Sequence, residues 1–276
     1  MSNTISILTP VKNEAQFIGY GVMSVLDYVD EIVYADGNST DGTLEILQHI
    51  KKRYDHKDKI KLCINKDCRN LQKDYERLFN FLLGKCKSDY VWFLHPDMLV
   101  TNPHEIREGL NDGLRYGINV RSVAGEHYNR EIVSGRGGTW NNIYRNDYGI
   151  HYAGYYGSAD EDFYFRDITG SSHDPYDIIY PKPYVSRLTD IEVYHFCECK
   201  PYERRYEKMC KILRTVFPHL KEEDVVKNAK VHPRVTLKNG TFNGAEFKFK
   251  KHGNLLHSLP VWKQYHEEFE KLRKGV

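Results

Sequence analysis

Short apolar runs alternate with amphipathic stretches over the first hundred residues. The runs, which have the length of buried strands, lie at 5–8, 32–35, 61–64 and 90–94. Between them, apolar residues recur every three or four positions over 18–29, 44–50 and 71–83, a spacing that predicts helices with one apolar face. Proline lacks the N–H that an interior strand needs, so Pro10 predicts that the first strand ends there. This alternation of predicted strands and helices indicates an α/β fold with a mainly parallel sheet and helices on both of its faces.

The remainder of the chain is irregular in its middle and helical toward its end. A helix is predicted over 102–114 and a strand over 118–124, whereas residues 125–190 are rich in Gly, Tyr, Asp and Asn. Such a long irregular stretch in a compact domain is usually functional, for instance as a loop that covers a substrate. Helical patterns return over 202–216, 222–229 and 261–274, with a hairpin predicted around Asn239 and Gly240.

Composition and charge describe a globular chain rather than a disordered or a general nucleic-acid-binding one. The 276 residues include 21 Tyr, 12 Phe and 3 Trp, and the formal net charge is only +2. This charge is unevenly spread, because residues 1–50 and 89–199 are acidic whereas 51–88 and 200–276 are basic. The basic segments that flank the acidic region suit an anionic ligand or surface, and the alternative is that their Lys and Arg residues are ordinary solvated helix faces.

The sequence carries no targeting or membrane-spanning pattern. Its first residues show no basic and then apolar leader, and no apolar run approaches the roughly 20 residues that span a bilayer. We therefore expect a cytoplasmic protein. Its basic C-terminal segment would allow peripheral contact with the cytoplasmic face of a membrane.

Three polar clusters follow predicted strands, at 9–14, 36–41 and 95–97. In parallel α/β sheets, ligands bind beyond the carboxyl ends of the strands. The three clusters therefore mark the predicted site.

The segments that contain these clusters resemble one enzyme family. Residues 5–14 read ISILTPVKNE, residues 31–43 read EIVYADGNSTDGT, and residues 89–97 read DYVWFLHPD. In order and spacing they resemble family 2 of the GT-A glycosyltransferases, whose strands end in Pro-x-x-Asn-Glu, in Asp before Gly-Ser-x-Asp-Gly-Thr, and in Asp-x-Asp. The resemblance implies a GT-A (Rossmann-like) fold. It also implies an inverting enzyme that transfers a hexosyl or related group from a nucleoside-diphosphate sugar to an acceptor hydroxyl.

The resemblance assigns the donor to the ends of the first two strands. It implies that Thr9, Pro10 and Glu14 line the base and ribose, and that Asp36 binds the base. A carboxylate can accept the imino N–H of uracil or guanine in a charge-assisted hydrogen bond, so we expect a UDP- or GDP-sugar. The alternative for Asp36 is a plain turn-forming role.

The diphosphate needs charge neutralisation, which a divalent cation on hard oxygen ligands normally supplies. By resemblance Asp97 is the metal-binding last Asp of the Asp-x-Asp motif, and His195, in the segment VYHFCECK, is a further ligand. The alternative for His195 is an ordinary buried histidine. His95 replaces the first Asp of that motif. We place His95 with the donor, and leave open metal ligation or a purely structural role. Imidazole beside carboxylate suits Mn²⁺ better than Mg²⁺.

Inverting transfer needs a general base near the acceptor hydroxyl. Residues 157–162 read GSADED and resemble the family's Gly-x-x-Glu-Asp motif, which implies Glu161 as the base with Asp160 as the alternative. Ser158 and Glu161 also form a capping-box pattern, so a purely structural role stays open. Asn13 and Asp41 are likewise open between site residues and caps of the first two helices.

We expect three parts: residues 1–100 as the nucleotide-sugar-binding half of a GT-A domain, 101–199 as the acceptor-binding half with long loops, and 200–276 as a basic, mainly helical C-terminal extension. The acceptor stays unspecified among glycan, lipid-linked, protein and nucleic-acid molecules. One alternative function is a catalytically degenerate GT-A-like module that binds a nucleotide or a partner, which His95 motivates. Another is a sugar-phosphate nucleotidyltransferase, although its glycine-rich loop has no counterpart in residues 9–14.

Overall fold

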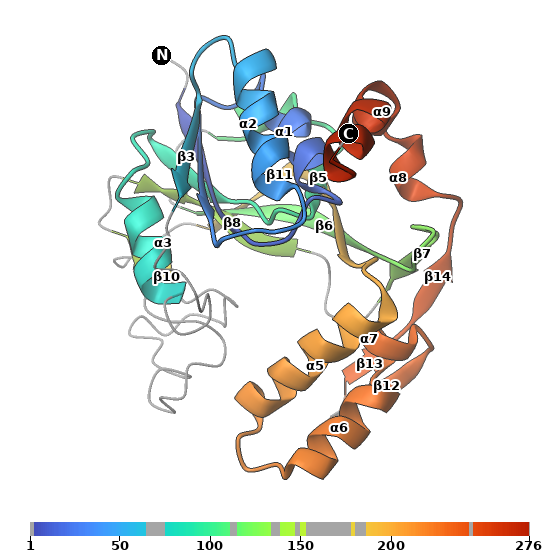
Figure 1. Ribbon diagram of the computed structural model, residues 1–276. Coiled ribbons are helices and arrows are strands. Elements are labelled where there is room, and N and C mark those ends of the chain that lie inside the picture. Colours follow the sequence, from blue (N-terminus) through green and yellow to red (C-terminus); the bar gives the residue numbers. More distant parts are fainter. Residues whose placement is uncertain are drawn as a thin grey trace.

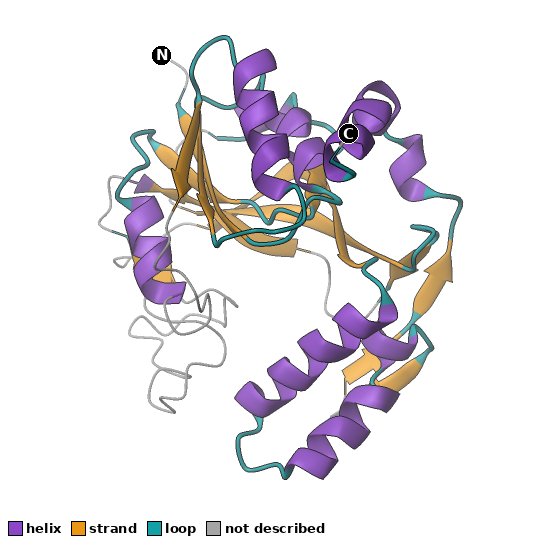
Figure 2. Ribbon diagram, in the orientation of Figure 1, coloured by secondary structure: helices purple, strands orange, loops and turns teal. Residues whose placement is uncertain are grey.

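The computed structural model describes residues 3–64, 75–110, 115–133, 139–146, 150–152, 178–179, 186–242 and 245–275. Its strands are β1 (Ile5–Val11), β2 (Glu31–Asp36), β3 (Ile60–Ile64), β4 (Tyr90–Phe93), β5 (Met98–Val100), β6 (Arg115–Ala124), β7 (Arg130–Ile132), β8 (Thr139–Arg145), β9 (His151–Tyr152), β10 (Ile178–Ile179), β11 (Ser186–Glu198), β12 (Gly240–Phe242), β13 (Ala245–Phe247) and β14 (Phe249–Lys251). Its helices are α1 (Ile18–Val25), α2 (Thr43–Arg53), α3 (Tyr75–Leu83), α4 (Glu105–Glu108), α5 (Tyr202–Val216), α6 (Glu222–Val231), α7 (Pro233–Thr236), α8 (Leu255–Ser258) and α9 (Pro260–Arg273). Figures 1 and 2 show a central sheet with helices on both sides, while α5 and α6 extend away from it.

A parallel core and a mixed extension make up the main sheet. Its strands follow the order β14-β7-β6-β8-β4-β1-β2-β3, and β11 pairs with both β5 and β6. Strands β4, β1, β2 and β3 run parallel to one another. Beyond them β8 is antiparallel to β4 and β6, whereas β6 and β11 are parallel. The expected α/β fold with a parallel core is therefore confirmed, and β6, β8 and β11 extend it as a mixed sheet.

Alternating side chains explain why both faces of the parallel core are covered. Along β1, Ile5 and Ile7 belong to the hydrophobic core under α1, α2 and α9, whereas Leu8 belongs to a second core under α3. Strand β4 divides in the same way, with Trp92 in the first core and Phe93 in the second. Successive residues of a strand point to opposite faces, so a continuous apolar run fits a strand buried on both sides.

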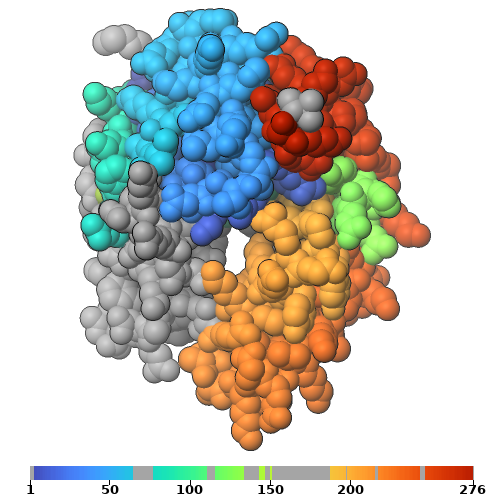
Figure 3. Space-filling view, viewed as in Figure 1, coloured from blue at the N-terminus to red at the C-terminus, as the bar shows by residue number. Residues whose placement is uncertain are grey.

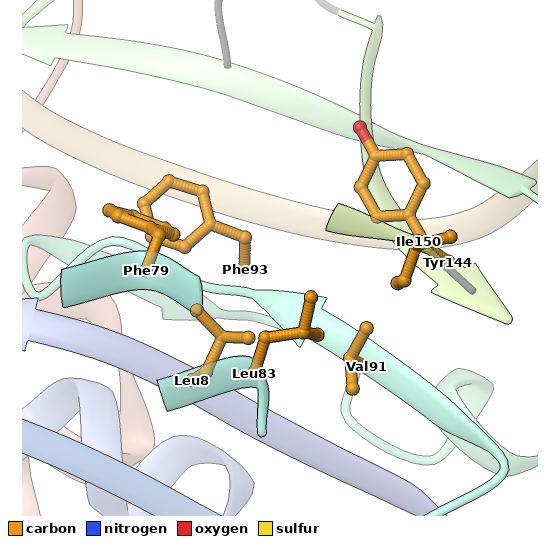
Figure 4. Close-up of a pocket in the computed structure, with 7 residues that line it drawn as sticks. All are labelled: Leu8, Phe79, Leu83, Val91, Phe93, Tyr144 and Ile150. Carbon is orange, nitrogen blue, oxygen red and sulfur yellow. The ribbon is translucent and has the colours of Figure 1, made fainter. Parts of the chain in front are cut away.

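A small apolar pocket lies in the second core, between α3 and the sheet (Figure 4). Seven residues line it: Leu8, Phe79, Leu83, Val91, Phe93, Tyr144 and Ile150. The Tyr144 hydroxyl is the only polar side-chain group among them. A charged ligand would find no partner here, so we treat the pocket as part of the core.

Strand β1 continues past Pro10, and the expectation that it ends there is wrong. The strand runs to Val11 within the ladder to β2. Pairing with β4 on the other side stops at Leu8, opposite Phe93. The Val11 carbonyl accepts the Gly37 N–H on the β2 side, so by alternation the Pro10 nitrogen faces the side where the ladder has ended. Its missing N–H therefore breaks no strand pairing.

Helix predictions differ in how well they match. Helix α5 has the bounds predicted over 202–216, and α9 begins and ends within one residue of its prediction. Of the helix predicted over 102–114, the structure describes residues 102–110, where α4 is the helical part and Gly109 is its C-cap. No helix in the described part of the chain is long and apolar enough to cross a membrane.

The C-terminal helix α9 packs on α1 and α2 (Figure 1). The ring of Phe269 lies so close to Gly19 that a Cβ there would come within 2.7 Å of it. Tyr54 donates its hydroxyl to Glu268 Oε2 at 2.6 Å, and His49 contacts the same carboxylate. Strand β14 also extends the main sheet beside β7. Residues 200–276 therefore return to the N-terminal half at two places.

His232 couples pH to the stability of the C-terminal helices. Its Nδ1 accepts the Arg234 N–H at 3.2 Å, and its ring packs against Phe242 with centroids 4.5 Å apart. Burial, with help from the Arg234 charge, lowers the pKa of His232 from 6.5 to about 4. The unfolded chain therefore binds this proton at a higher pH than the folded one, so stability falls as the pH drops through this window.

We expect His232→Asn to reduce this pH dependence, because asparagine can still accept at the N-cap but does not titrate. Urea unfolding at several pH values between about 7 and 4 measures the difference between variant and wild type. The free energy of unfolding should decline more steeply for the wild type. Parallel declines would contradict the assignment.

Candidate active site

Hydrogen bonds join the loops that follow β1 and β2. The side-chain carbonyl of Asn13 accepts the Thr40 N–H at 2.9 Å, and the Asn13 N–H donates to Ser39 Oγ at 2.9 Å. Asp41 accepts the Ala15 N–H at 3.1 Å. Asn13 has a left-handed φ of 55°, which asparagine tolerates better than most residues. Asn13 and Asp41 thus fix the two loops against each other at the carboxyl end of the sheet.

Asp36 ends β2 and is only 4% exposed. Its Oδ2 accepts the Ser39 N–H at 3.1 Å, which is the turn-forming contact that the sequence left open. Its Oδ1 is buried without a hydrogen-bond partner among the residues that the structure describes. Leaving a buried carboxylate oxygen unsatisfied is costly, so Oδ1 is available to a ligand that donates a hydrogen bond.

The donor-side candidates of β1 differ in what they offer. Thr9 donates its hydroxyl to the Leu94 carbonyl at 2.5 Å and so fastens β1 to the end of β4, while Pro10 lies buried in the strand. Glu14 Oε1 lies 2.5 Å from Lys200 Nζ. Glu14 Oε2 is buried and, within the described ranges, has no hydrogen-bond partner. Glu14 therefore offers a second available acceptor, after the end of β1, the strand beside β2.

Pairing of β5 with β11 brings His95, Asp97 and His195 together. Strand β5 begins directly after Asp97, and its antiparallel register places Met98 opposite His195. His195 Nε2 lies 3.2 Å from Asp97 Oδ1. One possible ligand atom from each of the three side chains lies within 4.8 Å of the other two, the one such group in the described part of the chain. Two imidazoles and a carboxylate can hold a divalent cation.

Burial and neighbouring charges set the protonation of this group. Burial, together with the neighbouring His195, lowers the pKa of His95 from 6.5 to about 3. Burial opposes ionisation of Asp97, but His195 and Lys200 outweigh it and hold the pKa of Asp97 well below its usual range. Neutral imidazole and ionised carboxylate are the forms that bind metal ions. His95 and Asp97 therefore need lose no proton before binding one near pH 7.

Lys200 is a residue of the site that the sequence analysis missed. Its side chain is only 12% exposed, and Nζ lies 3.5 Å from Asp97 Oδ2 as well as beside Glu14. Burial alone would lower the pKa of Lys200, but the two carboxylates raise it, so the ammonium stays charged. In the sequence, the only features that distinguish Lys200 are its closeness to His195 and its place before Pro201, the N-cap of α5. Neither feature indicates which groups the ammonium faces.

The predicted general bases, Asp160 and Glu161, lie outside the described residues.

Figure 3 shows that the surface is hollowed between the blue N-terminal segment and the yellow-orange start of the C-terminal segment. These two segments supply Glu14 and Lys200, whose ion pair joins them.

Comparison with known protein families gives a match to the N-terminal part of the chain. Residues 6–133 match the family model described as Glycosyl transferase family 2. A search of curated proteins finds no match.

Solved structures resemble this chain at low identity and with TM-scores below 0.5. TarS from S. aureus is 16% identical with a TM-score of 0.43, over 83% of this chain and 44% of TarS, so this chain spans less than half of that protein. The mannosyltransferase PcManGT from Pyrobaculum calidifontis, solved with GDP-Man and Mn²⁺, is 13% identical with a TM-score of 0.49, over 88% of this chain and 78% of its own. Mannosyl-3-phosphoglycerate synthase from Rubrobacter xylanophilus is 12% identical with a TM-score of 0.44, over 93% and 89% of the two chains.

The matched segment contains the parallel core of the sheet and the polar clusters at its strand ends. Residues 6–133 form a glycosyl transferase family 2 region, which contains β1, β2, β4 and the motifs at their ends. The resemblance and the GT-A fold class expected from the sequence are therefore confirmed.

Proposed function

We propose that this protein is a metal-assisted, inverting glycosyltransferase that uses a nucleoside-diphosphate sugar. One observation carries the proposal. The ends of the neighbouring strands β1, β2 and β4 present two buried carboxylate oxygens that lack a partner among the described residues, next to a group of possible metal ligands. A nucleoside supplies hydrogen-bond donors and a diphosphate requires cations, so the two halves of the site match the two halves of the donor.

For the nucleoside, the proposal uses Asp36 and Glu14. Asp36 Oδ1 would accept the imino N–H of uracil or guanine, and Glu14 Oε2 a ribose hydroxyl. Thr9 and Pro10 would act mainly through the backbone of β1, since the Thr9 hydroxyl is already bonded to Leu94. The donor would accordingly be a UDP- or GDP-sugar.

For the diphosphate, Asp97 and His195 would hold a divalent cation, with His95 as a third ligand because it lies in the same group. The cation supplies positive charge to the leaving diphosphate. The donor set of two imidazoles and one carboxylate favours Mn²⁺ over Mg²⁺.

For the acceptor, we propose residues 101–199 as the binding half. Glu161, with Asp160 as the alternative, would take the proton of the acceptor hydroxyl while the oxygen attacks the anomeric carbon. A new glycosidic bond forms as the bond to the diphosphate breaks. Attack opposite the leaving group inverts the anomeric configuration.

A panel of UDP- and GDP-sugars with Mn²⁺ or Mg²⁺ tests the function. We expect slow, metal-dependent hydrolysis to free nucleoside diphosphate, and a rise in melting temperature with the matching nucleotide. A rise without hydrolysis would favour a degenerate binding module. Pyrophosphate release from a sugar phosphate and a nucleoside triphosphate would favour a nucleotidyltransferase. The proposal is refuted if no nucleotide sugar is hydrolysed and no nucleotide raises the melting temperature.

Glu161→Gln should lower transfer by roughly 10²- to 10⁴-fold, because glutamine cannot accept the acceptor proton. Donor affinity should not change, since the proposal gives Glu161 no donor contact. Initial rates and nucleotide titrations separate the two effects. Asp160→Asn serves as the matched comparison. Unchanged turnover in Glu161→Gln would return this residue to its capping role with Ser158.

A further inference from the structure

A buried ammonium lies where the proposed site needs positive charge. Lys200 Nζ is 2.5 Å from Glu14 Oε1 and 3.5 Å from Asp97 Oδ2, so one lysine joins carboxylates from the ends of β1 and β4. These side chains are 12%, 11% and 7% exposed, respectively, so solvent screens the contacts little. The lysine is thus an internal counter-ion of the site.

Hydrogen bonds from Arg205 hold the backbone of Lys200 in place. Arg205, itself 6% exposed, donates to the Lys200 carbonyl and, at 3.3 Å, to the Val235 carbonyl. The Lys200 backbone is therefore tied to α5 and α7, while its long side chain reaches the sheet. A lysine stem has several rotatable bonds, so the ammonium can change partners without movement of this backbone.

The two carboxylate oxygens of Asp97 face different partners. Its Oδ1 faces His195 and the possible metal ligands, whereas its Oδ2 faces Lys200. A cation bound to Asp97 would lie close to the ammonium, and two positive charges at such short range repel each other strongly in a buried site. A donor diphosphate removes this conflict, because it offers oxygens to both cations.

We propose that Lys200 is a positioning residue that holds Glu14 and Asp97 before the donor arrives, disfavours metal binding without donor, and then moves to the diphosphate. This inference rests on the proposed function. It makes metal and nucleotide binding cooperative, since each ligand relieves a cost of binding the other. It also frees Glu14 Oε1 when the donor binds.

Lys200→Gln tests the inference through two affinities that should change in opposite directions. Without nucleotide, removing the ammonium should tighten Mn²⁺ binding by about tenfold, whereas affinity for UDP or GDP in EDTA should weaken by about tenfold. Calorimetry measures both quantities on the full chain. A role only in folding would not strengthen either affinity.

Two further variants are the controls. Lys200→Arg keeps the charge and should stay near the wild type in both titrations. Lys211→Gln removes an exposed lysine from α5, farther from Asp97 along the chain, and should leave both affinities unchanged. If Lys200→Gln binds Mn²⁺ no more tightly than the wild type, or if Lys200→Arg behaves like Lys200→Gln, the inference is overturned.

Failure of the inference differs from failure of the proposed function. If the wild type hydrolyses a donor with Mn²⁺ but Lys200→Gln binds Mn²⁺ as weakly as the wild type does, only the inference falls. If no variant binds a nucleoside diphosphate and no donor is hydrolysed, both fall.

Discussion

Replacing Asp97 with alanine should abolish metal-dependent hydrolysis of the donor, with a loss of at least about a hundredfold. Asp97 is the only carboxylate in the group with His95 and His195, and it also faces Lys200. Its removal takes away the one hard oxygen ligand and the negative charge that attracts a dication. Initial rates of nucleoside diphosphate release with increasing Mn²⁺ measure the loss.

The matched control is Glu45→Ala, which removes an exposed carboxylate from the first turn of α2. It should hydrolyse the donor at the wild-type rate and with the same Mn²⁺ dependence. Thermal melting distinguishes loss of metal from loss of fold, because the melting temperature of Asp97→Ala should no longer rise with Mn²⁺. If Asp97→Ala keeps the activity and its metal dependence, the proposed metal site is wrong. Wild-type hydrolysis that persists unchanged in EDTA would contradict it equally.

Asp36→Asn should weaken binding of the nucleoside diphosphate by roughly 10- to 100-fold. Asparagine can keep the bond from the Ser39 N–H through its carbonyl, but its amide then presents a donor where the nucleotide base also presents one. The substitution keeps the shape of the side chain and removes its charge. Calorimetric titration with UDP and GDP in EDTA measures the effect without contribution from metal.

The Mn²⁺ affinity of Asp36→Asn without nucleotide should equal that of the wild type, because Asp36 is not part of the group around Asp97. This contrast separates the nucleoside half of the site from the diphosphate half. Unchanged nucleotide affinity would leave Asp36 with its turn-forming role alone. A parallel loss of both affinities would show a general disturbance of the loops instead.

The local pattern predicted much of the parallel core. Apolar runs and helical spacing identified β1, β2, β3 and β4 and the helices between them, because side-chain periodicity is set by the geometry of each element. The error at Pro10 shows the limit of this reasoning. Whether a strand tolerates proline depends on which neighbour faces its nitrogen, and the end of the β4 pairing at Leu8 is a tertiary fact.

The candidate site also contains residues that the sequence identified and residues whose role depends on the tertiary structure. Asp36 and Asp97 could be selected as candidates because each lies within three residues of the end of an apolar run, and parallel strands end at one edge of a sheet. His195 was inferred only through resemblance to a family. Its contact with Asp97 depends on the register between β5 and β11. Lys200 was missed because nothing in its immediate sequence distinguishes a buried counter-ion from a solvated lysine.

The sequence by itself determined the order of strands and helices in the N-terminal half and placed carboxylates at the strand ends, since both are local properties. The tertiary structure alone decided which cationic and imidazole groups face those carboxylates. His195 and Lys200 reach Asp97 through long-range strand pairing and the packing that follows it. Such contacts depend on the register and burial of segments about a hundred residues apart, which no local pattern specifies.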